Sequence, residues 1–122
     1  MDVTKLRVYK QALEAFQLIE KIVKDLPLEL FDTKRQILRS SKAIPPLIAE
    51  GFGRRRSQKE LYRFVIEAMS SSDETITHLR IIAKSLFNKI PMEKLRTTAG
   101  VYKSVSKQLN KFASTIKFKS DL

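Results

Sequence analysis

Apolar residues recur every three or four positions along nearly the whole chain, and this spacing constrains the fold more than any other feature. Such spacing places apolar side chains on one face of an α-helix. Four stretches show it, over residues 6–26, 37–48, 61–86 and 95–116. Only three glycines and four prolines interrupt 122 residues, so turns are few and the segments between them are long. No strand pattern competes, and the sequence predicts an all-α protein.

Local signals mark where these helices begin and end. Pro27 ends the first stretch, and Asp32 is a suitable N-cap for the second. Ser57 and Glu60 form a capping box that opens the third, and Pro91 suits the first position of the fourth. The connections are short, which makes neighbouring helices antiparallel. We therefore predict an antiparallel up-down-up-down four-helix bundle in a single domain, residues 1–122.

Two prolines fall inside the second apolar stretch. Pro45 and Pro46 lack an N–H, and their rings clash with the preceding helical turn. The segment must therefore kink or break there, and we expect a helix that is kinked at Pro45-Pro46, resumes, and ends at Gly51. The hydroxyls of Ser40 and Ser41 are expected to satisfy the carbonyls that the prolines free.

The stretch AIPPLIAEGFGRRRSQKE, residues 43–60, raises the question of a phosphate-binding loop. A Walker loop needs Gly-Lys-Ser/Thr after a strand, and a dinucleotide fingerprint needs a third glycine. Residues 43–60 contain neither a Gly-Lys-Ser/Thr sequence nor a third glycine. We interpret the stretch instead as a corner between two helices, in which Gly51 adopts the left-handed C-cap conformation and Gly53 lets the chain turn.

Basic residues outnumber acidic ones by 24 to 13, a net charge of +11 that attracts polyanions. Arg54, Arg55 and Arg56 form a compact cation at the corner, suited to phosphate oxygens. The alternative is a solvated basic turn with one arginine paired to Glu50.

The fourth helix carries seven basic residues and no acidic one between positions 94 and 119. Lys103, Lys107 and Lys111 recur at every fourth position, so they share one face and repel one another unless an anion lies against them. With Arg54, Arg55 and Arg56, they are the predicted nucleic-acid-binding residues. The predicted function is binding of RNA or DNA through phosphate contacts. The alternative is a protein-interaction scaffold whose basic face docks an acidic protein partner.

The sequence offers little for catalysis. Cysteine is absent, and His78, the one histidine, follows Glu74 at a spacing that does not match a di-iron site. Glu60, Glu67 and Glu74 recur every seven residues, either for local ion pairs with Arg63 or for a basic helix of another subunit. We therefore expect no metal, no cofactor and no enzymatic activity.

A membrane location is also not indicated. No apolar run reaches the roughly 18 residues that span a bilayer. The first eleven residues lack the apolar core of a signal peptide. We expect a cytoplasmic protein that does not associate with a membrane.

The segment QILRSSKAIPPLIAEGFGRRRSQKELYRFVIEAMSSSDETITHL resembles a known family signature. It is similar to the four-helix-bundle proteins encoded by intervening sequences in bacterial 23S rRNA genes. Their pattern reads approximately Q-L-R-R-A-x-x-S-I-P-x-N-I-A-E-G-x-G-R, followed by A-x-G-S-x-x-E-x-x-x-x-L. Pro46 and Leu47 stand where the family has a small residue and Asn, and Ser70 replaces a glycine. The matching residues are Gln36, Arg39, Ile44, Pro45, Ile48, Ala49, Glu50, Gly51, Gly53, Arg54, Ala68, Ser71, Glu74 and Leu79.

The resemblance implies a homopentameric ring of bundles without established catalytic activity. It also implies a relationship to the accessory protein of diversity-generating retroelements, which binds nucleic acid and a reverse transcriptase. Within the signature, Ile44, Pro45, Glu50, Gly51 and Gly53 are expected to have structural roles.

Overall fold

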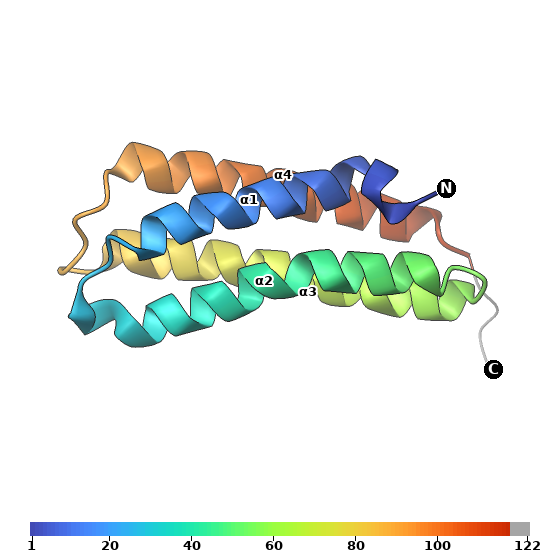
Figure 1. Cartoon of the computed structure of the whole chain (residues 1–122), viewed down its shortest axis with the longest axis horizontal. Coiled ribbons are helices and arrows are strands. Elements are labelled where there is room, and N and C mark those ends of the chain that lie inside the picture. The colour runs from blue at the N-terminus through green and yellow to red at the C-terminus, as the bar shows by residue number, and fades with distance from the viewer. Residues whose placement is uncertain (118–122) are drawn as a thin grey trace.

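The computed structural model describes residues 1–117, which form four α-helices and two short 3-10 helices and contain no strand. The α-helices lie side by side, and each runs opposite to the one before it (Figure 1). Each packs against its neighbours in sequence, and α1 also packs against α4, which closes the bundle. The predicted all-α four-helix fold is confirmed. The elements are η1 (Val3–Lys5), α1 (Arg7–Val23), η2 (Leu28–Leu30), α2 (Phe31–Gly53), α3 (Gln58–Lys84) and α4 (Met92–Thr115).

The core is formed by one face of each helix, and the predicted apolar positions are mostly buried. Several others are half-buried, and three are exposed: Leu13 at 45%, Phe112 at 40% and Leu86 at 99%. In α1 the buried face passes through Ala12 and Ala15, whose small side chains let neighbouring helices approach closely. Leu86 lies beyond the end of α3, so the helical spacing no longer applies to it.

Helix α2 continues through Pro45 and Pro46 without breaking and ends at Gly53, two residues later than predicted. The prediction that Asp32 is the N-cap is wrong. Because η2 leads directly into α2 at Phe31, Asp32 already lies in the first helical turn, where it pairs with Arg35 at 3.5 Å.

The serine hydroxyls before the prolines do not satisfy the carbonyls predicted for them. In an α-helix, Pro45 and Pro46 would leave the carbonyls four residues earlier, at positions 41 and 42, without a donor. Ser40 and Ser41 instead donate to the carbonyl of Ile37, at 3.3 and 2.6 Å. They therefore bond one helical turn upstream of the predicted acceptors.

Gly51 has a different role from the one predicted. It is buried inside α2, and no glycine in residues 1–117 has a positive φ, so the left-handed C-cap is wrong. A Cβ placed on Gly51 would lie 2.8 Å from Cβ of Phe64 in α3. Gly51 is thus required because α2 and α3 approach each other too closely for any side chain.

Gly51→Ala is expected to destabilise the protein by about 1–3 kcal/mol, because the Phe64 Cβ is fixed to the backbone and α3 must move. Gly100→Ala is the matched control, since a Cβ there meets nothing within 4 Å. It lies inside α4, where alanine should stabilise by about 0.5–1 kcal/mol. Urea denaturation of both variants tests this, and stabilisation by both would contradict the packing role of Gly51.

Hydroxyl groups link three of the helices within the core. Ser40 of α2 and Thr75 of α3 share a hydrogen bond of 2.8 Å. Ser72 of α3 donates to the carbonyl of Tyr102 in α4 at 3.0 Å and accepts from Ser106 at 2.7 Å. We call Ser40, Ser72, Thr75 and Ser106 the hydroxyl layer. Its bonds satisfy polar groups that would otherwise be buried at a cost.

Ser57 caps α3 as predicted, and its Oγ accepts from the N–H of Glu60 at 3.2 Å. The prediction that the Glu60 carboxylate accepts a hydrogen bond from the N–H of Ser57 is wrong. The N–H of Ser57 donates to the carbonyl of Arg54 at 3.0 Å, and the Glu60 carboxylate accepts from Arg63 at 2.9 Å. The competing arginine therefore draws Glu60 away from the helix end.

Candidate nucleic-acid interface

The three predicted lysines of α4 are exposed, and none forms an ion pair or side-chain hydrogen bond within residues 1–117. Successive helical residues are rotated by about 100°, so Lys103 and Lys111 point about 80° apart. Lys103 borders a hollow between α3 and α4, whereas Lys111 borders a pocket that α1 also lines. The three lysines therefore do not share a single face but extend partly around α4.

The hollow beside Lys103, which we call the α3–α4 depression, has a volume of about 400 Å³. Arg80 of α3 and Arg96 of α4 line it together with Lys103. All three side chains are exposed and have no partner in the part of the chain that the structure describes. Arg80, Arg96, Lys103, Lys107 and Lys111 together are called the basic face.

Arg80 was not among the residues predicted from the sequence. It is isolated in α3, and only the packing of α3 against α4 brings it to the same depression as Lys103. Arg96 belongs to the basic run of the fourth helix, but it does not fit the four-residue spacing of the three lysines and was therefore not selected.

The corner arginines are largely engaged in local contacts. Arg54 pairs with Glu50 at 3.1 Å and with Glu60 at 3.5 Å. Arg55 donates to the carbonyl of Phe52 at 2.9 Å, and its guanidinium lies 4.1 Å from the centre of that ring. Arg54 therefore forms the ion pair with Glu50 that the alternative interpretation requires.

Arg56 is the one corner arginine that remains exposed without a partner among residues 1–117. The hydrogen bond from Arg63, with the charge of Arg54 nearby, also holds the pKa of Glu60 below its usual value. The corner consequently offers less unpaired positive charge than three consecutive arginines suggest.

The acidic stripe of α3 is engaged in ion pairs within the chain. Arg63 pairs with Glu60 at 2.9 Å and with Glu67 at 3.4 Å. Glu74 pairs with Arg39 of α2 and lies 3.2 Å from Nε2 of His78. The predicted local ion pairs with Arg63 are therefore confirmed for Glu60 and Glu67, whereas Glu74 pairs with an arginine of another helix.

His78 is mostly buried, and its Nδ1 has no hydrogen-bond partner within the described chain. Within residues 1–117, no group of three or more metal-binding side chains comes together. The contact of His78 with Glu74 is a hydrogen bond within α3, four residues apart.

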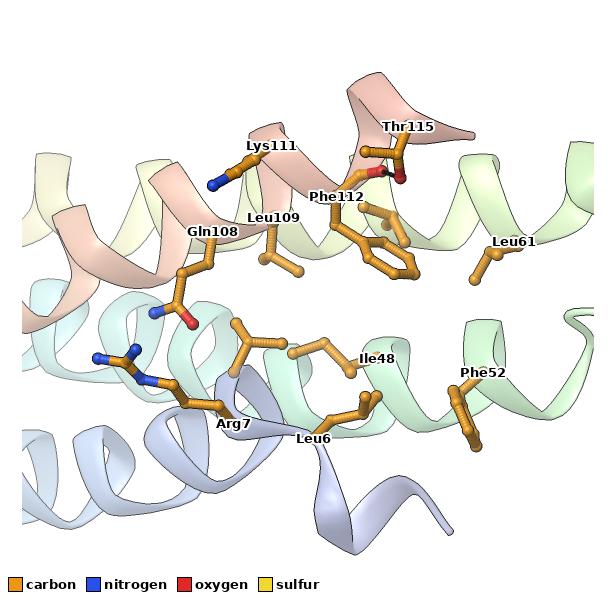
Figure 2. Close-up of a pocket in the computed structure, with 12 residues that line it drawn as sticks. Leu6, Arg7, Ile48, Phe52, Leu61, Gln108, Leu109, Lys111, Phe112 and Thr115 are labelled. Carbon is orange, nitrogen blue, oxygen red and sulfur yellow. Dashed lines mark hydrogen bonds between the residues drawn. The ribbon is translucent and has the colours of Figure 1, made fainter. Parts of the chain in front are cut away.

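A second hollow, which we call the end pocket, lies where all four helices meet near the α2–α3 corner, with a volume of about 360 Å³. Figure 2 shows Arg7, Gln108 and Lys111 at one side of it and Phe112, Phe52 and Leu61 towards the other. Its lining is mostly apolar and includes no acidic residue. The remaining lining residues are Leu6, Val8, Ile48, Val65, Leu109 and Thr115.

The model of the 23S rRNA-intervening sequence protein family matches residues 4–111. The chain belongs to this family. A comparison with curated proteins finds no match. Within residues 1–117 of this intervening sequence protein, no helix is long and apolar enough to span a membrane.

The signature residues of this intervening sequence protein mainly hold α2 in the bundle. Ile44, Pro45 and Gly51 are buried, and Gly51 lies against α3. Glu50 is half-exposed and pairs with Arg54, and Gly53 is the last residue of α2. The family match also includes Arg80, Arg96, Lys103, Lys107 and Lys111, so the whole basic face lies inside it.

Proposed function

We propose that this 23S rRNA-intervening sequence protein binds nucleic acid through phosphate contacts and catalyses no reaction. The observation that carries this proposal is the basic face, five exposed cations on α3 and α4 without partners in residues 1–117. Elsewhere, Arg39, Arg54 and Arg63 are paired with carboxylates. Ion pairs therefore engage arginines of α2, of the α2–α3 corner and of α3, but within residues 1–117 they engage none of the five cations of the basic face.

Leaving like charges side by side costs stability unless an anion offsets their repulsion. Lys103 and Lys107 are one helical turn apart, as are Lys107 and Lys111. A phosphate backbone supplies regularly spaced negative charge, and its neutralisation releases counterions. A polyanion therefore suits the basic face better than a single small anion. Binding of cellular nucleic acid would place the protein in the cytoplasm.

Titration of random-sequence oligonucleotides with the full chain at several salt concentrations tests the proposal. Affinity should fall steeply with salt, with a slope of log K against log salt of about −0.9 for each phosphate contacted on a duplex. Absence of binding at moderate salt would instead favour the scaffold that docks an acidic protein partner. A pull-down from native lysate with and without nuclease then separates the two partners.

We further propose that the protein self-associates through the end pocket, as a pentamer by family resemblance. Pro46 is exposed and Leu47 and Phe52 are half-buried, so the second half of α2 presents apolar surface. Phe52 and the exposed Phe112 both line the end pocket. Apolar surface of this kind tends to mark an interface.

Light scattering at micromolar concentration should therefore give the mass of an oligomer. Phe52→Ser with Phe112→Ser should reduce that mass by exposing hydroxyls where apolar contact is needed. Leu86→Ser is the matched control, because Leu86 is 99% exposed in the α3–α4 connection, at the other end of the bundle (Figure 1). A monomeric wild-type protein, or loss of assembly in the control alone, would refute this site of association.

A further inference from the structure

We infer that the protein prefers single-stranded nucleic acid over duplex, and that the α3–α4 depression accepts one unpaired base. This inference rests on the proposed function and names its ligand more narrowly. It follows from the shape and lining of the depression, because exposed lysines alone give no reason for such a preference.

The floor of the depression is apolar and its rim is cationic. Leu79 and Leu95 are buried beneath it, and Ala83 and Ala99 are half-buried. These alanines keep the floor open, since their side chains are the smallest that still favour a helix. The volume of about 400 Å³ is near the lower end of the range of about 300–1,000 Å³ for small-molecule sites. A flat, largely apolar ring fits such a floor.

The rim is arranged for the phosphates on either side of such a base. Arg80 approaches from α3, and Arg96 and Lys103 approach from α4. Asp73 shares a neighbouring hollow with Arg80 and Lys103 but pairs with neither, so their charges remain available. A guanidinium plane also stacks on unpaired bases, as in many RNA-binding sites.

Electrostatics alone predicts the opposite preference. A duplex carries one charge per about 1.7 Å of axis, and its counterion slope is steeper, about −0.9 per contact against about −0.7 for a single strand. A surface that contacts only phosphates therefore binds a duplex at least as tightly as a single strand. Tighter binding of the single strand requires contact with a base, which a duplex keeps inside its stack.

The test measures the fluorescence anisotropy of a labelled single strand of about 20 nucleotides without self-complementarity, and of the same strand annealed to its complement. The full chain should bind the single strand at least about fivefold more tightly, the low end of the range for one stacked base. A strand with abasic residues has the same phosphates, so its affinity should fall to the duplex value or below.

Ala99→Leu fills the depression without changing charge and should abolish the preference for the single strand while leaving duplex binding unchanged. Thr97→Leu adds the same side chain to an exposed position of α4 outside the depression and should preserve the preference. Circular dichroism establishes that both variants fold, and the abasic strand tests the wild-type protein even if they do not.

The possible failures are distinguishable. If the duplex binds as tightly as the single strand, or the abasic strand binds as tightly as the normal one, the single-strand inference is wrong and phosphate binding stands. If neither strand nor duplex binds at moderate salt, the proposed function itself is wrong.

Discussion

Replacing Lys103, Lys107 and Lys111 together with glutamine should weaken nucleic-acid binding by about two to three orders of magnitude at about 0.05 M salt. Each lost phosphate contact lowers the slope of log K against log salt by about one, so the slope should shrink by up to about three per subunit. Glutamine forms helices as well as lysine, and removing the repulsion should leave the fold intact or slightly more stable.

The corresponding triple variant of the corner gives the matched comparison. Arg54→Gln, Arg55→Gln and Arg56→Gln remove the same charge, but Arg54 and Arg55 are engaged in local contacts. We expect a slope change of about one, from Arg56. An equal effect of both triple variants would include the corner in the interface. A folded lysine variant with unchanged affinity and slope would favour the acidic protein partner.

Tyr102→Ala should produce the largest loss of stability, about 3–5 kcal/mol, comparable with truncation of a buried phenylalanine. Tyr102 has 0% exposure and packs within the apolar core. Its hydroxyl has no hydrogen-bond partner within the described chain. Tyr102→Phe should therefore be neutral or stabilising by up to about 1 kcal/mol, because it removes an unsatisfied buried group. Urea denaturation measures both, and a clear loss in Tyr102→Phe would reveal a hydrogen bond to the hydroxyl.

The same side chain should make stability depend on pH in alkaline solution. Burial raises the pKa of Tyr102 above its ordinary value of 10.0. The nearby Ser41 side chain lowers this pKa, but its effect is smaller than that of burial. Well below pH 10 the phenol is protonated in both the folded and the unfolded chain, so it does not make stability depend on pH. Above it the unfolded chain loses the proton first, so stability should fall by up to about 1.4 kcal/mol per pH unit. Tyr102→Phe should lose this contribution, which urea denaturation of both proteins at several alkaline pH values measures.

The helices could be predicted from the sequence because apolar spacing and the Ser57 cap are local signals. Gly51 shows the limit of such signals. A glycine near a helix end suggests a C-cap, but the approach of Phe64, thirteen residues later, determines its role. Asp32 was misassigned because η2 joins α2 without the extended residue that an N-cap needs.

The candidate site was predicted less completely because it depends on packing between helices. Lys103, Lys107 and Lys111 were found from their spacing, and their exposure agrees with that prediction. Arg80 could not be found in this way, because its position beside Lys103 depends on how α3 lies against α4. Conversely, the sequence suggested that the run of three arginines was available to a ligand. In the structure a carboxylate pairs with Arg54, and an aromatic ring lies against Arg55.

The hydroxyl layer limits how the helices can slide along one another. A shift of one helical turn, about 5.4 Å, would bring apolar side chains against other apolar side chains and change their burial little. The same shift would separate Ser40 from Thr75 and Ser72 from the Tyr102 carbonyl. Ser72 would then lose both of its hydrogen bonds, which costs about 1–3 kcal/mol for a buried hydroxyl, whereas Ser40 and Thr75 would keep their bonds to carbonyls of their own helices. The two bonds of Ser72 therefore favour one alignment of α3 and α4, and with it the register that places Arg80 beside Lys103.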